Sequence, residues 1–250
     1  MTGYLYDSAY LDTVQSLFGA TKRRSYELLN VVPGNRIFDI GCGNGKDAAA
    51  LAGMGATVLG IDCHADFLKD ASQLLSKRLS LDFLQSNADR IALSAESADK
   101  IRFDRVFQHL ENPTAVLIEA KRLLKPGGIC QVVDVDYFGL KISSCDVELE
   151  RLIVDSIAYE RIPNAHNIPD LRAMLADCGF VVTGSEAHPF VVEDYSTAKY
   201  LIRFDTVVEQ LLLRGRITEK QHQQWKRYED PAEATFRLVI PLIIVMAING

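Results

Sequence analysis

A cluster of glycines between two short apolar runs is the part of this sequence best suited to hold a ligand. Residues 36–62 read RIFDIGCGNGKDAAALAGMGATVLGID, with Gly41, Gly43 and Gly45 after the first run and Asp62 at the end of the second. Glycine lets the backbone approach a ligand closely because it carries no Cβ. An ionised carboxylate only accepts hydrogen bonds, so Asp62 suits the two hydroxyl groups of a ribose. The segment therefore predicts a pocket for a nucleoside.

Two common nucleotide loops fit this cluster poorly. A phosphate loop of the form Gly-x-x-x-x-Gly-Lys-Ser/Thr is excluded, because Asp47 follows Gly45-Lys46 and Ile40 stands where the first glycine is needed. A dinucleotide loop, Gly-x-Gly-x-x-Gly, lacks its third glycine when counted from Gly41. An NAD-dependent enzyme with a modified loop stays open as an alternative. The pattern that remains has an acid, Asp39, two residues before the first glycine.

Strands and helices alternate around this cluster. Strands are predicted at residues 36–40, 57–61, 81–85, 103–107 and 129–135, with helices at 10–30, 45–54 and 66–79 and another beginning at Asn112-Pro113. This alternation is typical of a parallel sheet with helices on both faces. Ligands bind at the carboxyl edge of such a sheet, and four segments should meet there, at Gly41, Asp62, Asn87 and Gln108.

The second half of the chain has a looser pattern. Helices are predicted at 145–159 and 170–178, a strand at 180–184, and a last strand near 242–247. Between those two strands, Ser196 is placed to cap one helix, and Thr218 with Gln221 predicts a capping box for another. We expect one domain over residues 1–250, with a helical cap at 1–30 and a helical insertion at 194–235 that forms a lid over the site.

Composition narrows the class of protein. The 250-residue chain has a formal charge of −6, which argues against a nucleic-acid surface, and its five cysteines form no CxxC pair, which fits a reducing, cytoplasmic location without a structural zinc site. The N-terminus lacks the pattern of a signal peptide, and the longest apolar run, residues 238–248, is about half a membrane span.

The glycine cluster resembles the first motif, D-x-G-x-G-x-G, of class I S-adenosylmethionine (SAM) dependent methyltransferases. The resemblance covers roughly residues 30–137. It includes Gln108-His109, Asn112-Pro113 and the sequence LKPGG at residues 124–128, which look like the ubiquinone/menaquinone-biosynthesis branch of that family. The resemblance implies a Rossmann-like, doubly wound, seven-stranded sheet that is mostly parallel with an antiparallel last strand. It also implies SAM as the cofactor and S-adenosylhomocysteine as the product.

The resemblance also implies roles for individual residues. Those expected to line the methionine tail are Asp39, Gly41, Gly43 and Asn44. Asp62 would hold the ribose, with Cys63 near the adenine. Asn87, or Asp89 in a shifted register, would accept a hydrogen bond from the adenine amino group. Further residues expected beside the cofactor are Cys42, Ala88, Phe107 and Gln108, and Arg24 would either reach the methionine carboxylate or be a surface arginine.

His109 is the candidate catalytic residue, because a histidine with an ordinary pKa near 6.5 suits base work at neutral pH. It would act either as a general base or only as part of the pocket wall. No Asn/Asp-Pro-Pro-Tyr/Phe or Pro-Cys sequence follows the fourth predicted strand, which argues against methylation of nucleic-acid bases. We therefore expect a methyltransferase for a small-molecule acceptor that needs no metal. A SAM-binding protein without transferase activity is the alternative, and the oligomeric state is left open.

Overall fold

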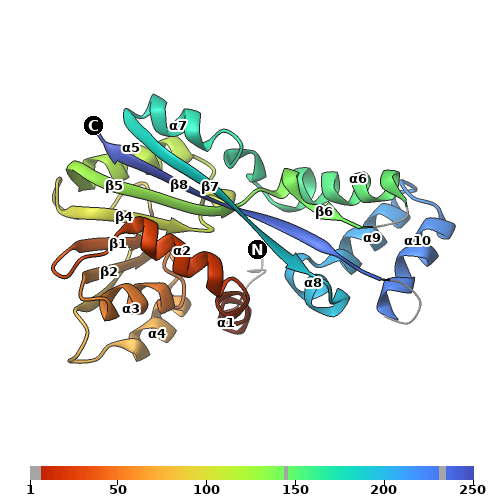
Figure 1. Ribbon diagram of the computed structural model, residues 1–250, viewed down its shortest axis with the longest axis horizontal. Helices are drawn as coiled ribbons and strands as arrows, with labels where there is room; N and C mark the ends of the chain where they lie inside the picture. The colour runs from red at the N-terminus through yellow and green to blue at the C-terminus, as the bar shows by residue number, and fades with distance from the viewer. Residues whose placement is uncertain (1–6, 144–145, 231–234) are drawn as a thin grey trace.

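The computed structural model describes residues 7–143, 146–230 and 235–250, and it is built on one mixed β-sheet (Figure 1). Five strands run parallel; in spatial order they are β3 (Leu81–Gln85), β2 (Thr57–Asp62), β1 (Arg36–Ile40), β4 (Ala98–Asp104) and β5 (Leu124–Val135). Strand β8 (Leu238–Asn249) runs antiparallel between β5 and β7 (Phe180–Val192), and the short β6 (Lys141–Ile142) pairs with its outer end. The predicted Rossmann-like α/β fold is confirmed, with β6 as an eighth strand.

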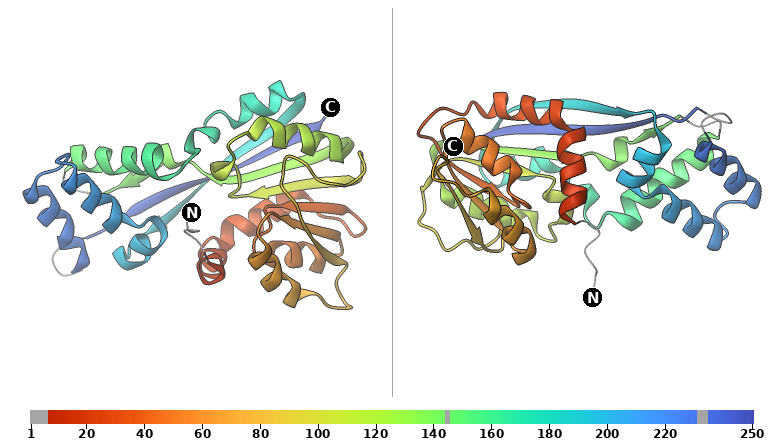
Figure 2. Two further views of the ribbon diagram at one scale, coloured as in Figure 1. Left: turned by 180° about the vertical axis from the view of Figure 1, so that it is seen from behind. Right: turned by 90° about the horizontal axis from the view of Figure 1, so that it is seen from below.

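Helices cover both faces of the parallel part of the sheet (Figures 1 and 2). One face carries α2 (Gly19–Leu29), α3 (Lys46–Gly53) and α4 (Ala65–Ala71), and the other carries α5 (Pro113–Leu123) and α7 (Leu171–Asp177). Asn112 caps α5 through a hydrogen bond from the Ala115 amide, as the Asn-Pro pair predicted. Each layer buries its own apolar cluster against the strands. The carboxyl edge of the sheet is therefore supported from both sides.

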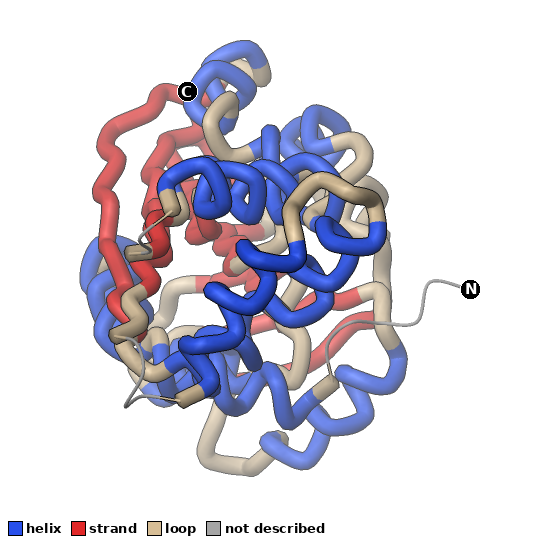
Figure 3. Tube along the Cα trace, turned by 90° about the vertical axis from the view of Figure 1, so that its right-hand side faces the viewer, coloured by secondary structure: helices blue, strands red, loops and turns tan. Residues whose placement is uncertain are grey.

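A second group of helices packs around the outer ends of β7 and β8, in front of the sheet in Figure 3. These helices are α6 (Val147–Asp155), the π-helical η4 (Ser156–Arg161), α8 (Tyr195–Ile202), α9 (Phe204–Leu213) and α10 (Glu219–Lys226). Trp225 is buried among them, and its Nε1 donates a 2.8 Å hydrogen bond to the Tyr195 hydroxyl. The capping box of Thr218 and Gln221 is present. Helices α8, α9 and α10 thus lie between the last two long strands.

Several predicted helix boundaries and caps were wrong. The helix expected over residues 10–30 is two helices, α1 (Ser8–Leu17) and α2, with a break at Phe18. Asp194, not Ser196, caps α8, because its carboxylate accepts a hydrogen bond from the Thr197 amide. Arg203, with φ of 58°, separates α8 from α9. Part of the helix expected over 145–159 lies outside the described residues, as does Cys145.

Strand β4 begins five residues earlier than the predicted 103–107. Two basic residues, Lys100 and Arg102, interrupt the apolar pattern, yet both are buried. Lys100 Nζ donates to the carbonyl oxygens of Leu29, at 2.7 Å, and Asn30 at the end of α2. The fold can bury these charges because polar groups from other elements pair with them.

Short helical turns complete the connections. They are η1 (Ser72–Leu74), η2 (Phe107–His109), η3 (Tyr137–Gly139), η5 (Ala165–Asn167) and η6 (Arg227–Glu229). In the part of the chain that the structure describes, no helix has both the length and the apolar character needed to cross a bilayer.

Candidate functional site

A cavity of about 690 Å³ opens at the carboxyl ends of the five parallel strands, β1 to β5. All four segments expected to converge there contribute to its wall. The predicted site residues that line it are Asp39, Gly41, Cys42, Gly43, Asn44, Asp62, Cys63, Asn87, Ala88, Gln108 and His109, together with Asp89. The cavity is therefore where the sequence places the cofactor site.

The glycine loop has no room for side chains at its first and last glycines. Gly41, Gly43 and Gly45 have φ values of 76°, 53° and 77°, a region that residues with a Cβ rarely adopt. A Cβ on Gly41 would lie 2.4 Å from Val106 Cγ2, and one on Gly45 would lie 2.6 Å from Phe83 Cζ. The glycines therefore allow the loop to fold back tightly against η2 and β3.

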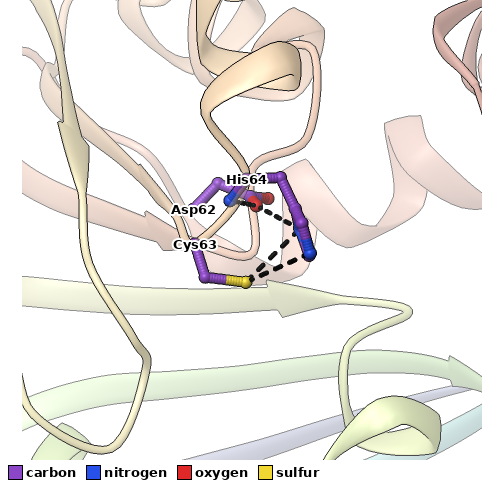
Figure 4. A group of neighbouring side chains, drawn as sticks. All are labelled: Asp62, Cys63 and His64. Carbon is purple, nitrogen blue, oxygen red and sulfur yellow. Dashed lines mark hydrogen bonds and ion pairs between the residues drawn. The ribbon is translucent and has the colours of Figure 1, made fainter. Parts of the chain in front are cut away.

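Asp62 connects the glycine loop to the end of β2. Its Oδ2 accepts a 2.8 Å hydrogen bond from the Gly43 amide, and its Oδ1 accepts one of 2.9 Å from the His64 amide. The His64 ring lies at 3.0 Å from the same Oδ1 and within 3.6 Å of Cys63 Sγ (Figure 4). A carboxylate offers about four acceptor positions. Two of these positions accept from the amides of Gly43 and His64. A ribose diol would need the other two, and so would displace the His64 ring from Oδ1.

Asp39 is buried at the end of β1, and one of its carboxylate oxygens has no partner among the described residues. The other oxygen lies 3.3 Å from Arg102 Nη1. Burial raises the pKa of Asp39 to about 7 in spite of Arg102, and the nearby Asp47 and Asp104 raise it further. An acceptor atom in the wall of a cavity without a donor is suited to a cationic group on a ligand.

Behind the glycine loop, Arg102 and Lys22 share two further carboxylates. Arg102 contacts Asp47 at 3.3 Å and Asp104 at 2.6 Å, and Lys22 reaches Asp104 at 2.8 Å as well as Asp47. All four side chains are buried or nearly so, and the two cations lower the pKa of both Asp47 and Asp104. This buried charge cluster fastens α2 to α3 and β4, and so fixes the loop between β1 and α3.

The turn after β4 presents Gln108 and His109 but not Phe107. Phe107 is fully buried and packs edge-on against Phe103, and its carbonyl oxygen accepts a 2.9 Å hydrogen bond from Asn167 Nδ2. Gln108 is buried, and its Oε1 lacks a partner among the described residues. Phe107 was expected to lie beside the cofactor through its backbone or its ring, but it is not among the residues that line the cavity, and its ring lies in the core.

His109 lines the cavity, and its side chain is exposed. Desolvation by the surrounding protein atoms and the positive charge of Arg105 lower the pKa of His109 to about 4, so its imidazole is neutral at physiological pH. A neutral imidazole can accept a hydrogen bond from an acceptor hydroxyl, but one with this pKa is a weaker base than an ordinary histidine.

Arg24 does not line the cavity. Its guanidinium donates to Glu186 of β7, with Nη2 at 2.7 Å and Nε at 3.0 Å from the carboxylate oxygens, and also contacts Glu27. The structure thus favours the surface reading of this residue. The cation that α2 brings to the charge cluster behind the glycine loop is Lys22, two residues earlier.

Three segments of the wall were missed by sequence reasoning. They are the α1–α2 residues Tyr10, Leu11, Gln15 and Phe18, the turn residues Arg161, Ile162 and Pro163, and the α8 residues Leu201 and Ile202. In the sequence these residues belong to apolar stripes or turns, and an apolar stripe does not reveal whether it faces a core or a cavity. Helix α1 is held over the loop by Gln15, which donates to Asp47 at 2.9 Å, and by Asp12, which accepts from Asn44 at 2.7 Å.

The groups in this part of the cavity wall fit SAM. The glycines leave bare backbone beside the ligand, the free oxygen of Asp39 suits the ammonium of a methionine tail, and Asp62 retains acceptor capacity for a ribose. No feature of the loop resembles a phosphate cradle, in agreement with a ligand that carries no phosphate.

Comparison with known proteins agrees with this geometry. Residues 38–132 match the family model described as a methyltransferase domain. An uncharacterized 37.1 kDa protein in a transposon from Streptomyces fradiae is 26% identical over 258 residues, which cover 99% of this chain and 74% of that protein. The ubiquinone biosynthesis O-methyltransferase of Dinoroseobacter shibae is 35% identical over 127 residues, which cover 50% of this chain and only about half, 51%, of that relative.

Among solved structures, a candidate methyltransferase from Bacillus halodurans has a TM-score of 0.69 at 17% identity, over 92% of this chain and 99% of that one. That likeness concerns the fold alone. The predicted resemblance to SAM-dependent methyltransferases of the ubiquinone-biosynthesis type is confirmed by the family match over residues 38–132 and by the similarity to the ubiquinone biosynthesis O-methyltransferase.

Proposed function

We propose that this member of the SAM-dependent methyltransferases binds SAM in the cavity and methylates a small molecule bound beside it, releasing S-adenosylhomocysteine. One observation carries the proposal: the cavity continues from the glycine loop into an apolar chamber. The chamber is lined by Phe18, Val135, Tyr137, Ile162, Leu201, Ile202 and Ile240, all of which belong to one apolar cluster around the outer end of β8. A cofactor and an acceptor can therefore share one enclosed space.

SAM would supply a methyl group on a positively charged sulfur, ready for in-line displacement. The protein's contribution is then alignment and exclusion of water. Asp39 would hold the ammonium of the methionine tail, and Asp62 the ribose hydroxyls. Asn87 would accept a hydrogen bond from the adenine amino group, with Cys63 alongside. Helices α1 and α8 close the chamber from the outside, which gives the predicted cap and insertion a role in enclosing the acceptor.

His109 lines the cavity from η2. We propose that its neutral imidazole accepts a hydrogen bond from the reacting group and orients it. Full proton removal by His109 is disfavoured by its pKa of about 4. An acceptor that is already ionised, or acidic, suits this site better than an alcohol.

The test is methyl transfer from labelled SAM to a metabolite extract, with labelled products identified by mass spectrometry. We expect label in small molecules with wild-type protein, and at least a tenfold lower rate with His109→Ala at unchanged SAM affinity. Label in nucleic acid alone, or SAM binding without any transfer, would contradict the proposal.

A further inference from the structure

The cavity wall changes its charge from one part to the other. Four carboxylates, those of Asp39, Asp47, Asp62 and Asp89, line the part at the carboxyl ends of β1, β2 and β3, where Arg102 is the one arginine that the described residues contribute. The apolar chamber instead carries two arginines, Arg105 beside Phe18 and Arg161 beside Ile162. The first part suits a cationic cofactor, and the second suits a ligand of the opposite charge.

The side chain of Arg105 is fixed in place, but not all of its hydrogen-bond donors have an acceptor within the described ranges. Its Nε donates a 3.2 Å hydrogen bond to Asp104 Oδ1, and its guanidinium carbon lies 6.0 Å from the centre of the Phe18 ring. Over residues 7–143, 146–230 and 235–250, this is the one hydrogen bond given by the Arg105 side chain. Both Nη atoms are therefore available to a ligand in the cavity that Arg105 lines.

Asp104 does not neutralise Arg105 by itself, because it also pairs with Lys22 and Arg102. The three cations of this group face two carboxylates with lowered pKa, Asp104 and Asp47, while the third, Asp39, contacts Arg102 rather than Arg105 and is the group proposed to pair with the cofactor's ammonium. The group thus has positive charge to spare on the side of Arg105. A bound anion would balance it.

The backbone of Arg105 is in an unfavourable conformation. Its φ of 57° lies in the left-handed region, which residues with a Cβ rarely adopt. The amide of Arg105 is fixed there by a 2.7 Å hydrogen bond to the carbonyl oxygen of Val133. Strain of this kind persists where the surroundings enforce it and is concentrated at functional sites.

We propose that Arg105 is a specificity-determining residue that selects, as methyl acceptor, an apolar small molecule bearing a carboxylate. The inference rests on the proposed function and names its substrate class. The planar fork of a guanidinium matches a carboxylate with two parallel hydrogen bonds. A phosphate carries more charge and would lose more hydration among Phe18, Tyr137 and Ile240, which are all buried apolar residues of the chamber wall.

The experiment compares matched acids and amides as ligands of the protein saturated with S-adenosylhomocysteine. The probes are hydroxylated benzoates, phenylacetates and cinnamates, each paired with its neutral primary amide, and binding is followed by ligand-observed NMR. We expect acids to bind at least tenfold more tightly than their amides. Arg105→Gln should abolish that preference, and Arg105→Lys should retain part of it. Arg214→Gln, which removes an exposed arginine paired with Glu160, is the control for net charge.

Titration of S-adenosylhomocysteine into each variant separates this proposal from the one on which it rests. We expect its Kd to change less than twofold in Arg105→Gln, with thermal denaturation showing a folded protein. Equal binding of acids and amides, no binding of any acid, or an acid preference that survives in Arg105→Gln would overturn the role of Arg105. A large loss of S-adenosylhomocysteine affinity would also overturn it, because Arg105 would then hold the cofactor's own carboxylate. If the wild-type protein does not bind S-adenosylhomocysteine, the proposed function fails, and the acid–amide comparison is made on the unloaded protein with the same criteria.

Discussion

The Gly43 amide donates a 2.8 Å hydrogen bond to Asp62 Oδ2, so the loop after β1 and the end of β2 are joined through one carboxylate. Asp62 is only 7% exposed and lines the cavity, and each of its two oxygens accepts one hydrogen bond from a backbone amide, which leaves further acceptor positions on both. The residue expected to bind the ribose thus also shapes the loop expected to hold the methionine tail.

The substitution Asp62→Asn should weaken SAM binding by tenfold or more, because an amide nitrogen replaces an acceptor that serves both Gly43 and the ribose. Asp66→Asn, in the exposed first turn of α4, is the matched control and should leave the Kd within twofold. Calorimetric titration of both variants gives the comparison. Equal affinities would remove Asp62 from the cofactor site.

His64→Ala should leave SAM affinity unchanged or improve it, since the ring competes with a ribose for Asp62 Oδ1. The backbone amide of residue 64, which also donates to Asp62, is retained in this variant. A tenfold loss of affinity, measured in the same titration, would show that His64 supports the ligand.

Gly41→Ala should abolish SAM binding, because the new Cβ would lie 2.4 Å from Val106 Cγ2 and force the loop away from η2. Gly34→Ala is a control with the same backbone problem but no clash: its φ is 88°, and no atom lies within 4 Å of the added Cβ. Both variants should lose about 1–2 kcal/mol of stability from the left-handed backbone. Only Gly41→Ala should also lose the ligand, and retained binding in it would contradict the loop's role.

The affinity for SAM should fall as the pH falls below 7. Asp39 has a pKa of about 7 in the unliganded protein, and its carboxylate must be ionised to pair with an ammonium group. The Kd should therefore rise by up to tenfold for each pH unit between pH 6.5 and pH 5.5. Titrations at these pH values should show the effect in the wild-type protein, and Asp39→Asn should bind more weakly with little dependence on pH. A flat wild-type profile would contradict this assignment.

Lys22→Met should destabilise the fold by about 3–5 kcal/mol, because it leaves Asp47 and Asp104 buried with only Arg102 to share between them. The loss should be larger at pH 8 than at pH 3, which lies below the ordinary pKa of 3.8 of an aspartate. Lys22 lowers the pKa of both carboxyls, and that stabilisation is present above their ordinary pKa and lost as they become protonated.

Arg24→Gln is the control, because it removes an exposed cation two residues away in the same helix. It should change neither the urea midpoint nor SAM affinity measurably. Chemical denaturation of both variants checks the prediction, and a large effect of Arg24→Gln would restore that residue as a candidate.

The local sequence patterns predicted the fold and the side of the cavity that contains the glycine loop. Strand β1 and the glycine loop adjoin in the sequence, and Asp62 ends the next strand, so their convergence follows from parallel topology alone. The start of strand β4 was predicted too late because Lys100 and Arg102 break its apolar pattern. Apart from Asp104 in the same strand, their partners lie in residues 25–47, which no pattern connects to them.

The acceptor side of the cavity could not be predicted in the same way. Phe18, Ile162 and Leu201 come from three distant segments, and each has the apolar character of an ordinary core residue. Arg105 has no motif to mark it, and its importance rests on a φ of 57° and on two free nitrogens that only the structure reveals.

The most direct measurement is calorimetric titration of the purified protein with SAM, S-adenosylhomocysteine and NAD. We predict one site with micromolar or tighter affinity for the two sulfur nucleosides, lost in Gly41→Ala and weakened in Asp62→Asn, and no heat of binding with NAD. Binding of NAD at this site, with no response to SAM, would contradict the account.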